Sequence, residues 1–92
     1  MRVRLTRKAD SDLTEILRCG SEHLGADAAD EYYLGLMAVI DLLAENPRIA
    51  HEIRDGVRAH PHRSHVIVYR ESEGRLDILT VRHGRSNWRK HL

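Results

Sequence analysis

The spacing of apolar residues predicts two amphipathic helices in the first half of the chain. Apolar residues recur three or four positions apart over residues 9–24 and again over 29–43, which is the period of one helix face. Thr6 and Asp27 are the candidate N-caps, and Gly25 is a natural stop for the first helix. Because only a few residues separate the two stripes, we expect an antiparallel helical hairpin whose apolar faces turn toward a common sheet.

Runs of alternating or β-branched residues predict four strands around this hairpin. Residues 2–5 alternate polar and apolar side chains, as a half-buried strand does. Residues 53–59 form a weak strand candidate with Gly56 inside it, whereas 64–70 and 76–81 are strong candidates. The last three runs predict an antiparallel meander. The order β-α-α-β-β-β therefore predicts an α+β fold, with the helical hairpin packed on a small antiparallel sheet.

Length and composition are those of one globular domain spanning residues 1–92. Apolar residues make up 41% of the chain and charged residues 32%, which is an ordinary balance for a folded protein. Cys19 is the only cysteine and has no disulfide partner, so we expect a small packing residue in a cytosolic protein. No apolar run is long enough to span a membrane, and no signal region is evident, so neither secretion nor membrane insertion is predicted.

Charge is distributed unevenly although the formal net charge is only +1. Residues 1–53 carry six Lys/Arg and ten Asp/Glu, a balance of −4, and residues 54–92 carry nine and four, a balance of +5. This pattern is compatible with a basic surface that meets an acidic partner. Mutual neutralisation of the two halves is the alternative.

The stretch from Arg82 to Leu92 is the most unusual part of the sequence. It holds the only Trp, four Lys/Arg, two His and no acid, and it follows directly on a predicted strand. Its last five residues are compatible with a short helix or an ordered coil. A chain end that frays would not need this composition, so the stretch is a candidate contact surface.

Nuclease chemistry is the catalytic interpretation of the basic strand ends. RNA cleavage needs a base, an acid and cations for the phosphorane charge, and Arg58, Arg82 and His83 are the candidates. No second acid or base is evident beside His83, so a solvated basic strand end is the competing interpretation. His60 and His62 are spaced like ligands on one strand face, but zinc needs three or four ligands. We therefore predict no metal site and no cofactor.

An ordered set of short motifs over nearly the whole chain resembles the RelE/ParE superfamily of toxins, specifically its ParE-like branch. No single motif is specific, whereas the ordered set is. The set comprises Leu5-Thr6, Ala9, Asp12-Leu13, Ile16, Gly25, Ala29, Tyr33-x-x-Leu36, Leu42-Leu43-Ala44-Glu45-Asn46-Pro47, Arg54-x-Gly56-Val57-Arg58, Ser64-His65-x-Ile67-x-Tyr69, Ile78-Leu79-x-Val81-x-His83-Gly84-Arg85 and Trp88-Arg89-x-His91-Leu92.

This resemblance implies a toxin of a type II toxin–antitoxin system. Family members similar to ParE trap DNA gyrase with cleaved DNA by binding, and their C-terminal segment is associated with toxicity. Here the corresponding target-binding residues would be Arg85, Asn87, Trp88, Arg89 and His91. Arg and Trp side chains suit such a contact.

The resemblance also implies a cognate antitoxin whose flexible tail folds over the toxin, giving a hetero-oligomer. As a further hypothesis, the tail enters a groove between the helices and the sheet, where Tyr33, Met37, Arg58 and Tyr69 are the predicted contacts.

Two alternatives to a gyrase-binding toxin stay open. The RelE branch cuts mRNA on the ribosome, often with a Tyr or His near the C-terminus. This chain has no Tyr after Tyr69 but keeps His83 and His91. A plain nucleic-acid binder is the other alternative, although one Trp and three Tyr give little support for stacking on bases.

Overall fold

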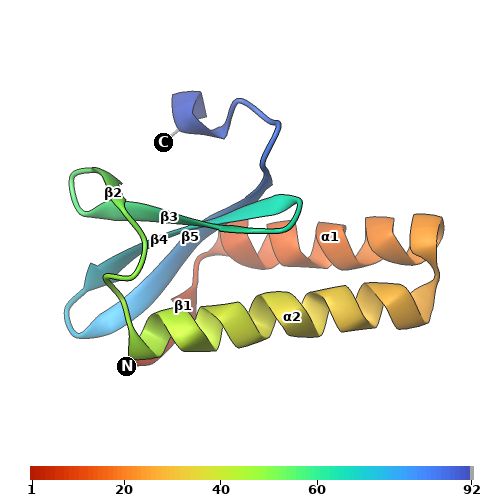
Figure 1. Ribbon diagram of the computed structural model, residues 1–92, viewed down its shortest axis with the longest axis horizontal. Coiled ribbons are helices and arrows are strands. Elements are labelled where there is room, and N and C mark those ends of the chain that lie inside the picture. The colour runs from red at the N-terminus through yellow and green to blue at the C-terminus, as the bar shows by residue number, and fades with distance from the viewer. Residues whose placement is uncertain (92) are drawn as a thin grey trace.

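The computed structural model describes residues 1–91, with only the backbone of His91. Two helices form an antiparallel hairpin against a five-stranded sheet (Figure 1). In chain order the elements are β1 (Arg2–Leu5), α1 (Arg7–Leu24), α2 (Ala26–Glu45), β2 (Glu52–Arg54), β3 (Val57–His62), β4 (His65–Ser72), β5 (Arg75–His83) and the 3₁₀ helix η1 (Trp88–His91). The α+β class is confirmed. No helix within the described residues is long and apolar enough to cross a membrane.

The helical hairpin begins at Thr6 and turns at a single residue. The Thr6 hydroxyl accepts a hydrogen bond from the Ala9 N–H at 3.1 Å, which confirms the predicted cap. Gly25, with φ +92°, both ends α1 and precedes α2. The prediction of Asp27 as the second N-cap is wrong, because Asp27 lies in the first turn of α2 and Gly25 occupies the cap position.

The sheet is mixed, with strand order β1-β5-β4-β3-β2. The predicted antiparallel meander is confirmed in β3, β4 and β5. β1, however, pairs with β5 in parallel, so the sheet is not wholly antiparallel. Thr6 reinforces this pair, since its backbone N–H donates to the Ile78 carbonyl at 3.1 Å and its hydroxyl lies 2.8 Å from the Leu79 carbonyl.

The weak strand predicted over 53–59 is in fact a hairpin of two strands. Asp55 and Gly56 form its turn, with φ +46° and +80°. A two-residue turn with positive φ at both positions is the type I′ geometry that Asp-Gly favours, and its twist matches that of paired strands. The chain therefore reverses at Gly56, and a fifth strand, β2, is added at the sheet edge.

The main core lies between the helices and one face of the sheet. Its fully buried side chains come from both helices and from the two central strands, and the largest include Leu13, Leu36, Ile40, Ile67 and Ile78. A smaller cluster lies on the opposite face, which we call the open face, and consists of Val57, Val66, Val68 and Trp88. Burial of these apolar side chains holds both layers together.

Asp12 fastens α1 to the central strand β5. Its carboxylate accepts hydrogen bonds from the Thr80 hydroxyl and, at 3.0 Å, from the Val81 N–H, and it pairs with Lys8 one turn earlier. Burial acts to raise the pKa of the Asp12 carboxyl, but the hydrogen bonds from Lys8, Thr80 and Val81 outweigh it and lower the pKa below 3.8. The ionised carboxylate is therefore the form that the fold selects.

Candidate functional site

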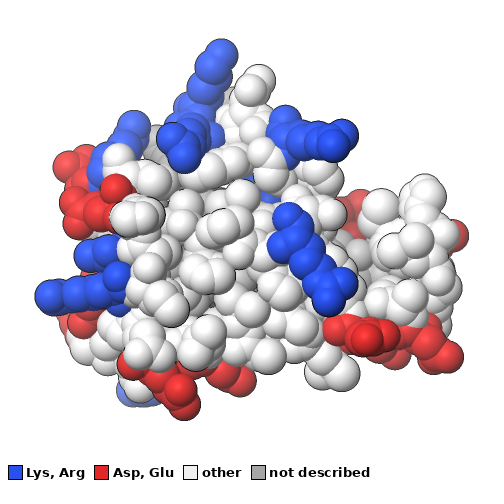
Figure 2. Space-filling model, in the orientation of Figure 1, with Lys and Arg blue, Asp and Glu red and all other residues white. Residues whose placement is uncertain are grey.

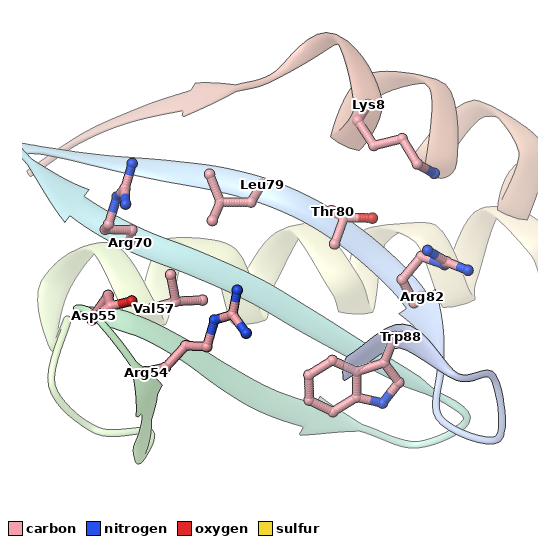
Figure 3. Close-up of a pocket in the computed structure, with 9 residues that line it drawn as sticks. All are labelled: Lys8, Arg54, Asp55, Val57, Arg70, Leu79, Thr80, Arg82 and Trp88. Carbon is pink, nitrogen blue, oxygen red and sulfur yellow. The ribbon is translucent and has the colours of Figure 1, made fainter. Parts of the chain in front are cut away.

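A cleft of about 380 Å³ lies on the open face and is rimmed by cations; we call it the cationic cleft (Figure 3). Its lining residues come from α1, from the strands β2 to β5 and the turn between β2 and β3, and from η1. Its lining residues are Lys8, Arg54, Asp55, Val57, Arg70, Leu79, Thr80, Arg82 and Trp88. Arg70 lies toward one end of the cleft, and Arg82 with Trp88 toward the other (Figure 3). One acid, Asp55, stands among four cations.

Strand alternation explains how these side chains reach the same face. Val66, Val68 and Arg70 follow one another at steps of two on β4 and therefore point the same way. On β5 the register shifts by one residue, since Val68 pairs with Thr80 while Tyr69 pairs with Ile78. This bulge lets Leu79 and Thr80 both line the cleft.

Trp88, one of the predicted target-binding residues, is a packing residue in this structure. It is only 7% exposed and packs with Val57, Val66 and Val68 on the open face. The guanidinium of Arg89 lies 5.0 Å from the centre of its ring, within cation–π range. Trp88 therefore ties the C-terminal segment to the sheet rather than presenting an indole to a partner.

Other contacts fix the segment that leads to Trp88. The Gly84 N–H donates to the Ser64 carbonyl at 2.8 Å, and the Ser86 N–H donates to the His83 carbonyl at 3.0 Å. The predicted target-binding residues Arg85, Asn87 and Arg89 are exposed along this segment. The side chain of His91, the remaining predicted contact, lies outside the described residues.

The three nuclease candidates do not converge. Arg82 lines the cationic cleft, whereas its neighbour His83 points to the helix side of the sheet and lies beside His65. Val57 also lines the cleft, so the adjacent Arg58 points away from it, and its Nη1 donates to the Ala50 carbonyl at 2.6 Å. A single phosphate therefore cannot meet all three side chains on one face.

A second cleft, of about 480 Å³, lies between the helical hairpin and the ends of β4 and β5, and we call it the histidine cleft. The Tyr32 hydroxyl and His65 Nδ1 are 2.7 Å apart and share a hydrogen bond, and the rings of His65 and His83 are 5.6 Å apart. Burial, together with the charges of His83 and His62, lowers the pKa of the His65 imidazole. The cleft therefore favours a neutral imidazole, which suits packing better than anion binding.

The prediction that Cys19 is a packing residue is wrong, because Cys19 is exposed at the rim of the histidine cleft. Its Sγ lies 3.6 Å from His23 Nδ1, but that nitrogen is also 2.8 Å from the Cys19 carbonyl. The spacing of one helical turn produces this contact. The signal for exposure was that Glu15, Glu22 and His23, three or four positions away on α1, are polar.

The groove predicted for an antitoxin tail is only partly accessible. Tyr69 is fully buried, and its hydroxyl donates to the Pro47 carbonyl at 2.8 Å, so Tyr69 cannot be a surface contact. Tyr33 and Met37 are half-buried and pack against the main core. Arg58 is also half-buried and points toward the Ala50 carbonyl.

Sequence reasoning missed Lys8, Arg54 and Arg70 as members of a site. For Arg70 a signal existed, because it follows Val66 and Val68 at steps of two residues and therefore points to the same face of the strand. For Arg54 the signal was the Asp-Gly turn, which folds β2 onto the sheet beside β3. Within residues 1–91, no group of three or more His, Cys, Asp or Glu side chains is placed to hold a metal ion.

Comparison with known proteins finds a family model and relatives that match nearly the whole chain. Residues 3–88 match the model of the family described as ParE toxin of the type II toxin–antitoxin system parDE. Toxin ParE1 of Mycobacterium tuberculosis is 37% identical over 95 residues, covering 99% of this chain and 97% of that protein. Toxin ParE1 of Caulobacter vibrioides is 35% identical over 92 residues, covering 97% and 95%.

Two solved structures share the fold. The chromosomal ParDE system from P. aeruginosa superposes with a TM-score of 0.80 at 20% identity, covering 90% of this chain and 95% of that one. The toxin–antitoxin complex RelBE2 from Mycobacterium tuberculosis gives 0.58 at 22% identity, covering 89% and 95%. With the family match over residues 3–88 and relatives at 35% and 37% identity, the chain belongs to the ParE toxin family of type II toxin–antitoxin systems.

Proposed function

We propose that this toxin acts by binding DNA gyrase and that a cognate antitoxin neutralises it. The observation that carries the proposal is the acid-free segment after β5, which Trp88 holds against the open face while Arg85, Asn87 and Arg89 stay exposed. Membership of the ParE family supports gyrase as the target. We also propose that the toxin is located in the cytoplasm, as predicted from the sequence.

Binding accounts for the described side chains better than catalysis does. Arg82 and His83 lie on opposite faces of the sheet, and Arg58 is engaged with a backbone carbonyl. General acid–base cleavage of RNA would need such groups within hydrogen-bond reach of one substrate. The ribosome-dependent nuclease is therefore the weaker candidate.

An antitoxin partner is supported by the two structural neighbours, which are a ParDE system and a toxin–antitoxin complex. We keep Tyr33, Met37 and Arg58 as proposed contacts of its tail, because all three retain some exposed surface. Tyr69 is withdrawn from this set because it is fully buried.

A supercoiling assay tests the target. We expect the purified toxin to inhibit gyrase, the double variant Arg85→Glu/Arg89→Glu to lose most of that inhibition, and added cognate antitoxin to restore supercoiling. These substitutions are preferable to deletion of the segment, since deletion would remove Trp88 and expose the Val57, Val66 and Val68 cluster.

Arg48→Glu is the matched control, because Arg48 is an exposed arginine that follows α2 and lies outside the C-terminal segment. Supercoiling that continues unchanged at high concentrations of folded toxin would refute gyrase as the target. Cleavage of mRNA in a translating extract, abolished by His83→Ala, would favour the nuclease instead.

A further inference from the structure

We propose that the cationic cleft binds the phosphodiester backbone of duplex DNA. The inference rests on the proposed function, since it assigns to the toxin its own contact with the DNA on which gyrase acts. It concerns the open face of the sheet, which neither helix covers (Figure 1).

The cations of the cleft come from four separate elements. Lys8 lies on α1, Arg54 on β2, Arg70 on β4 and Arg82 on β5. Among the described side chains, no ion pair joins Arg70 or Arg82 to an acid. Folding thus brings together positive charges that are far apart in sequence, and two of them lack an intramolecular counter-ion. Such a convergence costs repulsion unless an anion offsets it.

The positive surface continues from the cleft into the C-terminal segment. Arg85, Arg89 and Lys90 are exposed there, and the chain has no acid after Asp77. Figure 2 shows Lys and Arg side chains gathered at the top of the molecule, where the C-terminal segment lies in Figure 1. A ligand with charges repeated along its length can meet both regions at once, as a nucleic-acid backbone does.

The opposite side of the molecule is acidic. Helix α2 carries five acids, Asp27, Asp30, Glu31, Asp41 and Glu45, and no Lys or Arg. Acidic side chains accordingly predominate along the lower edge of Figure 2, where α2 runs. This separation orients the molecule in the field of a polyanion, because the open face is attracted while α2 is repelled.

The floor of the cleft favours DNA over an acidic peptide. Val57 is 9% exposed and Trp88 is 7% exposed, so these two side chains offer little surface for the side chains of a peptide to bury. The charged groups of the lining are mainly guanidinium and ammonium groups, which bind phosphate oxygens. Asp55 is the one acid in the lining and opposes an anion at that end only.

Fluorescence anisotropy of a labelled DNA duplex tests the proposal on the full chain. Each phosphate contact adds about −0.9 to the slope of log K against log salt, so Arg70→Ala/Arg82→Ala should make the wild-type slope shallower by about 1.8. Arg48→Ala, at an exposed arginine that does not line the cleft, keeps the wild-type slope. Circular dichroism of each variant verifies its fold.

Trp88 reports where the DNA binds, because it is the only tryptophan and lines the cleft. We expect bound DNA to change its fluorescence. Unchanged fluorescence, equal slopes for the Arg70→Ala/Arg82→Ala and Arg48→Ala variants, or polyglutamate binding as tightly as DNA would each overturn the proposal. The last result would assign the cleft to an acidic protein surface.

The supercoiling assay separates this inference from the function on which it rests. If the toxin inhibits gyrase but binds no free DNA, the DNA inference fails and the gyrase proposal stands. If DNA binds with the expected slopes and gyrase is unaffected, the gyrase proposal fails alone.

Discussion

Trp88 joins the C-terminal segment to the open face of the sheet. It closes the small cluster on the open face and at the same time fixes the backbone from which Arg85 and Arg89 project. A large aromatic ring buries much apolar area at a low cost in side-chain entropy, so one residue suffices to order a short segment. The segment is thus presented in one geometry rather than as a flexible tail.

Substituting Trp88 by Ala therefore affects stability as well as binding. We expect a loss of about 3 kcal/mol in the free energy of unfolding, the lower end of the range for buried aromatics, because the cluster is small. Urea unfolding followed by circular dichroism measures the loss. Trp88→Phe, which retains an aromatic ring, is the control and should lose less; a cost equal to that of Ala would argue against packing as the role.

Asp12 gives the fold a predictable dependence on pH. Its folded-state pKa lies below 3.8, so its contribution is present above that pH and is lost as the pH falls through the folded-state pKa. We expect Asp12→Asn to lower the free energy of unfolding by about 1–2 kcal/mol at neutral pH. The gap between variant and wild type should narrow as the pH falls through the lowered folded-state pKa of Asp12.

Urea titrations at neutral and acidic pH measure this gap. Asp10→Asn serves as the control, since Asp10 is an exposed acid on the same helix. A gap of the same size at both pH values would show that the Asp12 charge is not what fastens α1 to β5.

At the scale of elements, we expect a Gly→Ala substitution to have opposite effects on stability at Gly56 and at Gly35. Gly56 has φ +80°, and an added Cβ would lie 3.8 Å from the Arg70 Cδ, so space is available and only the backbone resists. Gly35 lies within α2, where a Cβ would make an ordinary 3.5 Å contact with His62 Nε2. We expect Gly56→Ala to destabilise by about 1 kcal/mol and Gly35→Ala to stabilise by about 0.5–1 kcal/mol. Thermal unfolding of the two variants decides, and shifts of the same sign would contradict the argument.

Elements with a strong local pattern could be predicted from the sequence, and those that depend on pairing could not. The Thr6 cap and the apolar stripes of α1 and α2 are local signals, and both helices are found where they were expected. The partner of β1 is set by long-range contacts, so its parallel pairing with β5 had no local signature. The Asp55-Gly56 turn did have one, but a single weak strand was predicted through it.

At the scale of the whole molecule, the acids of α2 and the cations of the cationic cleft lie on different sides of the fold. The uneven charge was visible in the sequence, and Arg82 was a candidate from the start. The cleft itself was not visible, because Lys8, Arg54 and Arg70 meet only when the sheet forms. The opposite directions of Arg82 and His83 were not visible either, because the predicted strand ended at residue 81 whereas β5 continues to His83.

The parallel pair of β1 and β5 also has a consequence in time. Thr6 and Leu79, which are hydrogen-bonded across this pair, lie 73 positions apart in the sequence. During synthesis the ribosome makes β1 before the other four strands and β5 after them, so β1 has no partner until β5 has been made. A nascent chain that stops before β5 lacks the strand that connects β1 to β4. The order of translation therefore delays the appearance of folded toxin until β5 has been made.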